Sequence, residues 1–242
     1  MKKIIITGGN GRFANILKKN FYGKNIFYFN KREFNILSKR SIEKKVNSIK
    51  PDIILHLAAL SRPLSIHEKE ISKSIDINIL GTCNLVKICE KSSIKLIYMS
   101  THYVYPCKKG NYLETNSLLP SNNYSWSKLG GECAVQMYLK NSLIIRVAMF
   151  ETPFPYEYAY TNIKSSFLSH NDVAKILPKI IQKRGIINLG GKRQSIYNFA
   201  KKTNKNVKPS KYKPSFKKIK VVRDSSVNIN KLKSFINLKK II

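Results

Sequence analysis

The sequence predicts an α/β fold, in which a doubly wound parallel sheet is followed by a small C-terminal α/β region. Short apolar β runs alternate with amphipathic helical patterns through the first 150 residues. The β runs are almost continuously apolar, which is typical of parallel strands covered by helices on both faces. After Ala148 the alternation loosens. We therefore divide the chain into a domain over 1–150 and a smaller region over 151–242 that ends in a basic tail.

The composition is that of a folded protein with an unusual positive charge. The 242 residues are 43% hydrophobic and carry a formal net charge of +32. Such a chain can bury a core, and it has no run of 18 apolar residues, so we expect neither general disorder nor a membrane span. Of the 45 basic residues 37 are Lys, and no helix-turn-helix, RNA-binding or zinc-finger signature accompanies them. We interpret the charge as a Lys-biased surface and expect no specific nucleic-acid partner.

Cysteine usage points to a reducing compartment. The four cysteines, Cys83, Cys89, Cys107 and Cys133, show no CxxC spacing and no histidines at zinc-finger intervals. We expect no structural metal and no disulfide scaffold, and a cytoplasmic location.

Each element of the first domain follows from a local pattern. A run of three isoleucines predicts a strand over 3–7, and apolar residues at helical spacing predict a helix over 11–21. The same two patterns predict strands over 26–29, 52–57, 95–99 and 143–147, and helices over 41–49, 68–91 and 122–138. The long helix is expected to bury one side, formed by Ile71, Ile75, Ile79, Leu85 and Ile88.

The elements beyond Ala148 are expected to be shorter. Turn residues and brief apolar runs delimit them. They are a loop over 152–160, a helix over 171–182 with Asn171 or Asp172 near its start, a strand over 186–189, a helix over 195–202, an extended basic segment over 205–220 and a short helix over 228–235.

A glycine-rich turn joins the first strand to the first helix, with the sequence Thr7-Gly8-Gly9-Asn10-Gly11-Arg12-Phe13-Ala14. The glycines at positions 8 and 11 permit a tight turn and let backbone N–H groups approach a pyrophosphate. Ala14 is small where the helix and the strand pack closely. At a first strand–helix junction this pattern is typical of a Rossmann-like dinucleotide site, so we expect the domain over 1–150 to bind NAD(P).

The end of the second strand bears on which dinucleotide binds. Folds that prefer NAD place an acidic residue there to hold the ribose hydroxyls. This chain has Asn30-Lys31-Arg32 instead, and the two cations suit a 2′-phosphate. We favour NADP(H) and keep NAD(H) open, because ordinary surface charges are also frequent in a Lys-rich chain.

A second constellation combines Thr101, at the end of a predicted strand, with Tyr124 and Lys128 in the following helix. Residues four apart on a helix share one face. A Lys ammonium beside a phenol favours the phenolate and so prepares the Tyr for proton transfer. The hydroxyl of Thr101 can bind the same substrate oxygen.

With these motifs, the sequence resembles the extended short-chain dehydrogenase/reductase superfamily, and within it the dTDP-4-dehydrorhamnose reductase group. The resemblance covers nearly the whole chain. The matching pieces include ITGGNGRFA (6–14), PDIILHLAALS (51–61), LIYMSTHYVY (96–105), YSWSKLGGE (124–132), LIIRVAMF (143–150) and INLGGKRQSIYNFA (187–200).

The resemblance implies a role for each matching position. Tyr124 would protonate the carbonyl oxygen as hydride arrives, Lys128 would bind the ribose and tune Tyr124, and Thr101 would polarise the substrate oxygen. The implied cofactor contacts, besides Tyr124 and Lys128, are Gly8, Asn10, Gly11, Arg12, Phe13, Lys31, Arg32, Asn35, Ile36, Ala58, Ala59, Leu60 and Asn78. The implied substrate contacts are Thr101, His102, Arg146 and Phe150, with no metal.

Two departures from the family's pattern bear on the reaction. His102 stands where these reductases usually carry Asp, and the stretch over 148–172 is shorter than their usual substrate-binding insertion. The 4,6-dehydratases need an acid pair after the Thr, which His102-Tyr103 does not supply. Enzymes that make GDP-fucose place a Cys at the position of Tyr103. Simple reduction needs neither group.

We therefore expect an NAD(P)H-dependent reductase that transfers hydride to the 4-keto group of a sugar nucleotide. A sugar-nucleotide 4-epimerase and a non-catalytic NADP-binding regulatory subunit remain alternatives, and a homodimer stays open. We interpret His56 and Asp172 as structural residues, and His67 and His170 as surface or cap residues.

Overall fold

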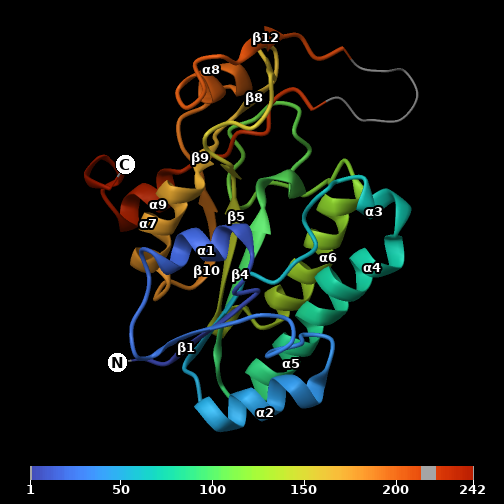
Figure 1. The fold of residues 1–242 in the computed structure, drawn as a ribbon, viewed down its shortest axis with the longest axis vertical. Helices are drawn as coiled ribbons and strands as arrows, with labels where there is room; N and C mark the ends of the chain where they lie inside the picture. Colours follow the sequence, from blue (N-terminus) through green and yellow to red (C-terminus); the bar gives the residue numbers. More distant parts are fainter. Residues whose placement is uncertain (1, 214–221, 242) are drawn as a thin grey trace.

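A six-stranded parallel sheet forms the centre of the computed structural model, which describes residues 2–213 and 222–241 (Figure 1). Its strands in spatial order are β2 (Ile26–Phe29), β1 (Ile4–Thr7), β3 (Ile53–His56), β4 (Lys95–Thr101), β5 (Ser142–Val147) and β10 (Gly185–Leu189). The strand order reverses beside β1, where open α/β sheets form a crevice at the carboxyl ends of the strands. Thr7 lies opposite Phe29 and His56 in the sheet register, so the strand ends on either side of this crevice are level.

Helices cover both faces of the sheet, which confirms the predicted doubly wound α/β architecture. One face packs against α1 (Arg12–Lys18), α7 (His170–Ile180) and α9 (Asn230–Phe235), and the other against α2 (Lys39–Ile49), α5 (Gly81–Lys91) and α6 (Asn123–Met137). In Figure 1 the first group lies to the left of the strands, and α5 and α6 lie to the right. Strand β10, which follows α7 in the chain, forms the edge of the sheet beside β5. The sheet therefore contains strands from both halves of the sequence.

Local capping explains where several helices begin. The side chain of Ser38 accepts a hydrogen bond from the backbone N–H of Ser41 at the start of α2, and Asn122 caps α6 in the same way. The N-cap of α7 is Ser169, and Asp172 completes a capping box with it. The interpretation of Asp172 as a structural acid therefore fits its place, while the helix begins slightly earlier than predicted.

The long helix predicted over 68–91 is wrong, because four elements occupy this stretch. They are α3 (Ile66–Lys69), α4 (Ile71–Ile75), the π-helix η1 (Asp76–Leu80) and α5. Glu70 has φ −126° and ψ 65°, which ends α3, and the π turn then rotates the helix face. Ile71 and Ile75 consequently face solvent, while Leu85 and Ile88 are buried as predicted.

Polar residues take the inward positions along this broken segment. Ser74, Asn78 and Thr82 recur at helical spacing and are all buried. Thr82 contacts His56 and Asn78 contacts Ser127, so the inward side of this segment is polar, and an apolar periodicity alone misplaces it.

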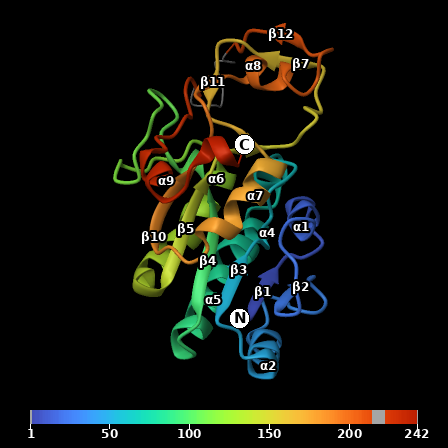
Figure 2. The ribbon, with the colours of Figure 1, turned by 90° about the vertical axis from the view of Figure 1, so that its left-hand side faces the viewer.

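A small lobe stands above the carboxyl edge of the sheet (Figure 2). Aromatic side chains form its interior, among them Phe150, Phe154, Phe167 and Phe199. Its elements are β6 (Met149–Phe150), β7 (Tyr158–Tyr160), β8 (Lys164–Ser165), β9 (Leu168–Ser169), β11 (Gln194–Ser195), α8 (Ile196–Lys201) and β12 (Lys208–Ser210). β7 replaces the end of the loop predicted over 152–160, because it pairs with β12.

Short 3-10 turns complete the described chain: η2 (His102–Val104), η3 (Leu139–Asn141) and η4 (Leu238–Lys240). Residues 214–220 of the extended segment predicted over 205–220 lie outside the described residues, and the described part of the segment contains β12. Within residues 2–213 and 222–241, no helix has the length and apolar character needed to cross a membrane.

Candidate active site

The glycine-rich turn after β1 lies in close contact with neighbouring backbone. Gly8 has φ +69°, and a Cβ at this position would lie 2.8 Å from backbone atoms of Ala58. A Cβ on Gly9 would lie 2.9 Å from the backbone N of Phe29, to whose carbonyl Gly9 donates a hydrogen bond. A side chain at either position would clash with this neighbouring backbone. The turn therefore leaves backbone uncovered beside the crevice, as a dinucleotide pyrophosphate requires.

The ends of β1 and β3 are joined by a buried hydrogen-bonded chain. Thr7 Oγ1 lies 2.9 Å from His56 Nδ1 and accepts a hydrogen bond from the backbone N–H of Ala58 at 3.1 Å. On the other side of the ring, His56 Nε2 lies 3.1 Å from Thr82 Oγ1. Burial, with a smaller contribution from the positive charge of Lys128, lowers the pKa of His56 to about 3. His56 is thus neutral and has a structural role, as we interpreted it from the sequence.

Asn78 holds the loop that follows β3. Its side chain accepts from the N–H of Leu60 at 2.8 Å and donates to the Leu60 carbonyl at 2.9 Å. It also donates to Ser127 Oγ at 2.8 Å. The predicted cofactor contacts from Ala58 to Leu60 are therefore fixed to the helix that carries Lys128.

Thr101 and Tyr124 are hydrogen-bonded at the carboxyl end of the sheet, and Lys128 follows in the same helix. Thr101 is the last residue of β4, and Tyr124 lies in the first turn of α6, one turn before Lys128. Burial raises the pKa of Tyr124, and a side-chain hydrogen bond with Thr101 and the positive charge of Arg62 oppose this rise. The geometry suits a phenol that donates its proton in a partly desolvated site.

Lys128 is buried beside an aromatic ring. Its Nζ lies 4.2 Å from the ring centroid of Tyr98, a cation–π distance. Burial lowers the pKa of Lys128 to about 7, although the negative charge of Glu132 favours its protonation. The amine therefore changes its protonation state close to neutral pH.

Arg146 corrects one expected substrate contact. Its guanidinium is buried, and its Nη2 lies 2.6 Å from Glu132 Oε1. It also donates to Tyr105 Oη at 2.8 Å and to the carbonyl of Glu114 at 2.9 Å. Since these core groups occupy its donors, Arg146 is placed to hold β5, α6 and the loop after β4 together rather than to meet a substrate.

His102 is buried beneath the site rather than exposed in it. Its Nδ1 lies 3.0 Å from the carbonyl oxygen of Val147, and its ring centroid lies 4.0 Å from that of Tyr103 and 5.5 Å from that of Phe167. Burial lowers the pKa of His102 to about 4, so the ring is neutral. His102 packs against Tyr103 and against the aromatic core of the lobe. Tyr103 and Phe150 are the half-buried members of this aromatic group.

Two residues that the sequence did not single out, Glu151 and Arg62, bridge the mouth of the crevice together with the predicted cofactor contact Arg12. Glu151 Oε2 lies 3.0 Å from Arg62 Nη1 and 3.5 Å from Arg12 Nη1. Arg62 Cζ lies 5.0 Å from the ring centroid of Phe150. These contacts join the loops after β1, β3 and β5. No local pattern in the sequence predicts such a link.

His67 also departs from its predicted surface position. It is fully buried in α3, and its ring centroid lies 5.1 Å from that of Tyr124. The broken helix explains the difference, because α3 turns back toward the start of α6.

Some of the cofactor-binding residues predicted after β2 are exposed to solvent. Lys31 and Arg32 are exposed, and Asn30 Oδ1 accepts the backbone N–H of Arg32 at 2.8 Å. Asn35 accepts from the N–H of Leu37 at 3.1 Å, while Ile36 is buried against α5. The two cations are thus accessible to an anion, whereas Ile36 belongs to the apolar core.

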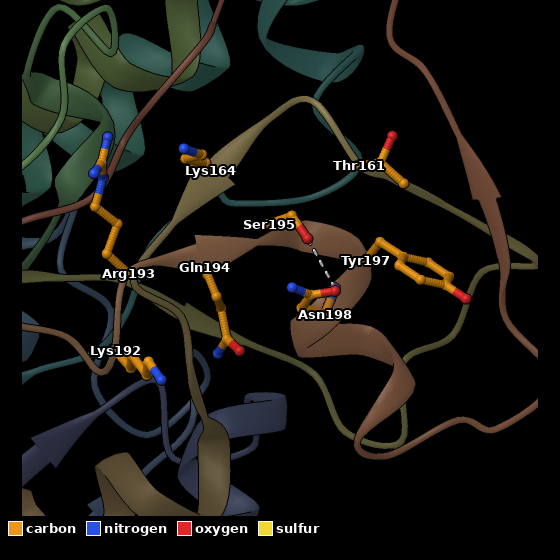
Figure 3. Close-up of a pocket in the computed structure, with 8 residues that line it drawn as sticks. All are labelled: Thr161, Lys164, Lys192, Arg193, Gln194, Ser195, Tyr197 and Asn198. Carbon is orange, nitrogen blue, oxygen red and sulfur yellow. Dashed lines mark hydrogen bonds between the residues drawn. The ribbon is translucent and has the colours of Figure 1, made fainter.

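The C-terminal lobe carries a cavity of about 520 Å³ with a basic lining (Figure 3). Figure 3 shows Lys164 on β8, Lys192 and Arg193 just before β11, and Asn198 on α8 around it. Arg193 Nη2 lies 2.6 Å from a carboxylate oxygen of Asp224. Within the described ranges, no group of three or more His, Cys, Asp or Glu residues could hold a metal ion.

Comparisons with known proteins agree with this arrangement. The sequence model of the RmlD substrate binding domain matches residues 1–161. The zebrafish methionine adenosyltransferase 2 subunit beta is 27% identical over 155 residues, which is 60% of this chain and 47% of the relative. The spore coat polysaccharide biosynthesis protein SpsK of Bacillus subtilis is 28% identical over 151 residues, which is 61% of this chain and 53% of the relative. These matches span about half the length of the relatives.

Solved structures match over almost the whole chain. The dTDP-4-dehydrorhamnose reductase of Bacillus anthracis, in complex with NADP, has a TM-score of 0.83 and 23% identity, covering 99% of this chain and 97% of that one. The UDP-glucose 4-epimerase of Thermus thermophilus, in complex with NAD, has a TM-score of 0.74 and 16% identity, covering 96% and 92%. At these identities the likeness establishes the fold, including the lobe above the sheet.

Proposed function

Since this chain belongs to the RmlD substrate binding domain family, we propose that it is an NADP(H)-dependent reductase of a keto-sugar nucleotide. The observation that supports the proposal is the hydrogen bond between Thr101 and Tyr124 at the carboxyl end of the sheet, with the buried Lys128 one helical turn after Tyr124. A module that only bound a cofactor would have no chemical need for all three side chains at this place.

The residues around the crevice fit a dinucleotide. The turn at Gly8, where a Cβ would clash with neighbouring backbone, suits a pyrophosphate, and the loop from Ala58 to Leu60 would pass beneath the nicotinamide-side ribose. When bound, the reduced nicotinamide supplies the hydride for the reaction. Lys31 and Arg32 would hold a 2′-phosphate, which favours NADP(H), and NAD(H) remains open.

The protein's own part in the reaction is proton transfer and orientation. Tyr124 Oη would give its proton to the carbonyl oxygen as that oxygen gains negative charge. The hydroxyl of Thr101 would donate to the same oxygen and hold it in place. Lys128 would stabilise the phenolate that Tyr124 becomes, and when protonated it would hold the ribose hydroxyls.

A phosphate-bearing substrate suits the charges above the sheet. Arg62 lies over Phe150 at the mouth of the crevice, and Lys164 and Lys192 line the cavity of the lobe. Phe150 and Tyr103 offer flat apolar surface of the kind that packs against a sugar ring. The structural likeness to a dTDP-4-dehydrorhamnose reductase supports a substrate of that class.

Two other functions account for part of the same evidence. A non-catalytic subunit is favoured by the similarity to methionine adenosyltransferase 2 subunit beta, and a 4-epimerase by the fold match to a UDP-glucose 4-epimerase. An epimerase would retain NAD through purification, and a regulatory subunit would form a stable complex with its partner while turning over no keto-sugar. We expect instead that NADPH binds exchangeably and is consumed with a 4-keto sugar nucleotide, and measuring NADPH oxidation on a panel of such substrates tests the proposal.

A further inference from the structure

The short helix α3 docks onto the first turn of α6. The carboxylate of Glu68 accepts two hydrogen bonds from Asn123, one from the backbone N–H at 3.3 Å and one from the side-chain amide at 2.8 Å. The same amide donates to the backbone carbonyl of His67 at 3.3 Å. Asn123 directly precedes Tyr124, so these bonds fasten the part of α6 that carries the phenol.

The ring of His67 packs on the ring of Tyr124. The two ring centroids lie 5.1 Å apart with an interplanar angle of 59°. His67 Nδ1 lies 2.7 Å from Ser74 Oγ on α4, and both residues are buried. Among the described residues, His67 Nε2 has no hydrogen-bond partner. The imidazole is therefore anchored to α4 by one edge and packs against the phenol with its body.

The position of Tyr124 makes such support necessary. Tyr124 is the second residue of α6, and first turns of helices fray because their N–H groups lack partners within the helix. Its phenol must nevertheless keep its oxygen on Thr101, because proton transfer requires a fixed donor. Asn122 caps the turn through Ser125 but does not restrain the ring of Tyr124.

Burial of a polar imidazole at position 67 costs free energy. A buried polar atom without a hydrogen bond costs free energy that an apolar side chain of similar shape would avoid. Burial lowers the pKa of His67, and the carboxylate of Glu68 and a backbone group of Ser61 oppose this effect. The ring keeps its one bond to Ser74, and that bond fixes the plane it presents to Tyr124.

We propose that α3 positions Tyr124 for proton transfer, with His67 orienting the phenol ring and Glu68 anchoring the helix turn beneath it. Neither residue is assigned contact with substrate or cofactor. The inference rests on the proposed reductase function, in which Tyr124 is the proton donor.

Kinetics of three variants separate positioning from a general structural role. In His67→Ala we expect kcat to fall by about tenfold, because small misplacements of a donor slow the chemical step, while KM for the sugar nucleotide and Kd for NADPH stay within about twofold. His67→Phe restores a flat ring without the bond to Ser74, so it should recover only part of the loss, with kcat still about threefold below wild type. Lys69→Ala, on the exposed side of the same helix, is the matched control and should behave as wild type.

A second readout does not depend on turnover. Tyrosine labelled with 13C at Cζ reports the phenol's titration by NMR, and Tyr124→Phe assigns its signal among the 13 tyrosines. The groups that bear on this titration are Thr101 from β4, Arg62 from the loop after β3 and His67 from α3. Burial raises the pKa of Tyr124, so His67→Ala, which admits water to one side of the ring, should lower it toward 10.

The two readouts distinguish failure of this inference from failure of the proposed function. If His67→Ala matches Lys69→Ala in both the phenol titration and kcat, α3 does not position Tyr124. If wild type fails to oxidise NADPH with every keto-sugar nucleotide tested, the reductase proposal fails. The titration alone then decides whether His67 controls the environment of Tyr124.

Discussion

Asn78 donates a hydrogen bond to Ser127 Oγ at 2.8 Å, and the same side chain holds both backbone groups of Leu60. A single amide thus couples the loop proposed to lie under the cofactor to the helix that carries Tyr124 and Lys128. Asn78 lies in the π-helix η1, where its side chain is buried and can reach both partners.

Asn78→Ala should therefore weaken both stability and cofactor binding. The substitution leaves the half-buried N–H of Leu60 without its partner and removes the buried bond to Ser127, which together cost about 1–3 kcal/mol. We expect the free energy of unfolding to fall by that amount and Kd for NADPH to rise by about tenfold. Urea unfolding and fluorescence titration measure the two effects, with the exposed Asn47→Ala as control. Unchanged NADPH binding would show that the loop is not held for the cofactor.

Lys31 and Arg32 should discriminate between the two dinucleotides. A charge-assisted bond to a 2′-phosphate contributes about 1.5–3 kcal/mol, so Lys31→Ala/Arg32→Ala should weaken NADPH binding by more than about tenfold and leave NADH binding unchanged. Titration at low and high salt, with the exposed Lys44→Ala as control, measures the effect. Equal Kd values in the variant and wild type at both salt concentrations would remove this role for the two cations.

Arg146→Met should destabilise the fold without changing substrate affinity. The variant leaves the carboxylate of Glu132 buried without its cation, which costs about 3–5 kcal/mol. Adding Glu132→Gln removes that charge and should recover part of the loss. Urea unfolding of the single and double variants measures this coupling. A raised KM at wild-type stability would instead return Arg146 to the substrate contacts.

The depressed pKa of Lys128 gives a signed pH dependence of stability. Burial lowers this pKa to about 7, while the unfolded side chain keeps its proton up to about pH 10.4. Between these values the unfolded chain binds one more proton than the folded chain, so stability rises with pH by at most about 1.4 kcal/mol per unit. Compared with Lys128→Met, wild type should therefore gain stability between pH 7 and pH 9 in urea unfolding without cofactor. Parallel curves for the two proteins would show that Lys128 titrates normally.

The cavity of the lobe supplies a test of the substrate's charge. Lys164→Gln/Lys192→Gln should raise KM for a sugar nucleotide several-fold and leave kcat unchanged, because the two cations lie outside the catalytic trio. Lys175→Gln on the exposed face of α7 is the control. Steady-state kinetics at low salt show the largest difference, since salt screens exposed charges. An unchanged KM would indicate that substrate phosphates bind elsewhere.

Local patterns in the sequence were sufficient for much of the fold. Each core strand is a short apolar run, so β1 to β5 and β10 were predicted to within about two residues, and the glycine-rich turn marked the crevice. Thr101, Tyr124 and Lys128 could be found because a strand end and one helical turn fix their spacing.

The parts that were missed depend on contacts between distant segments. The break at Glu70 and the π turn of η1 carry no Pro or Gly signal, and they decide that Ser74 and Asn78 face inward. His67 was misread for the same reason. The links from Arg146 to Glu132 and from Glu151 to Arg12 join different elements of the fold, and local apolar patterns do not report such pairs.

The most direct test of the account is the rate of NADPH oxidation by wild type and Tyr124→Phe with a 4-keto sugar nucleotide. Removing one hydroxyl leaves the ring against His67 in place but takes away the proton donor. The account predicts that wild type turns over and that Tyr124→Phe binds NADPH normally while losing at least about a hundredfold in kcat. Equal rates in the two proteins would contradict the assignment of Tyr124 as the proton donor, and with it the reaction proposed for this site.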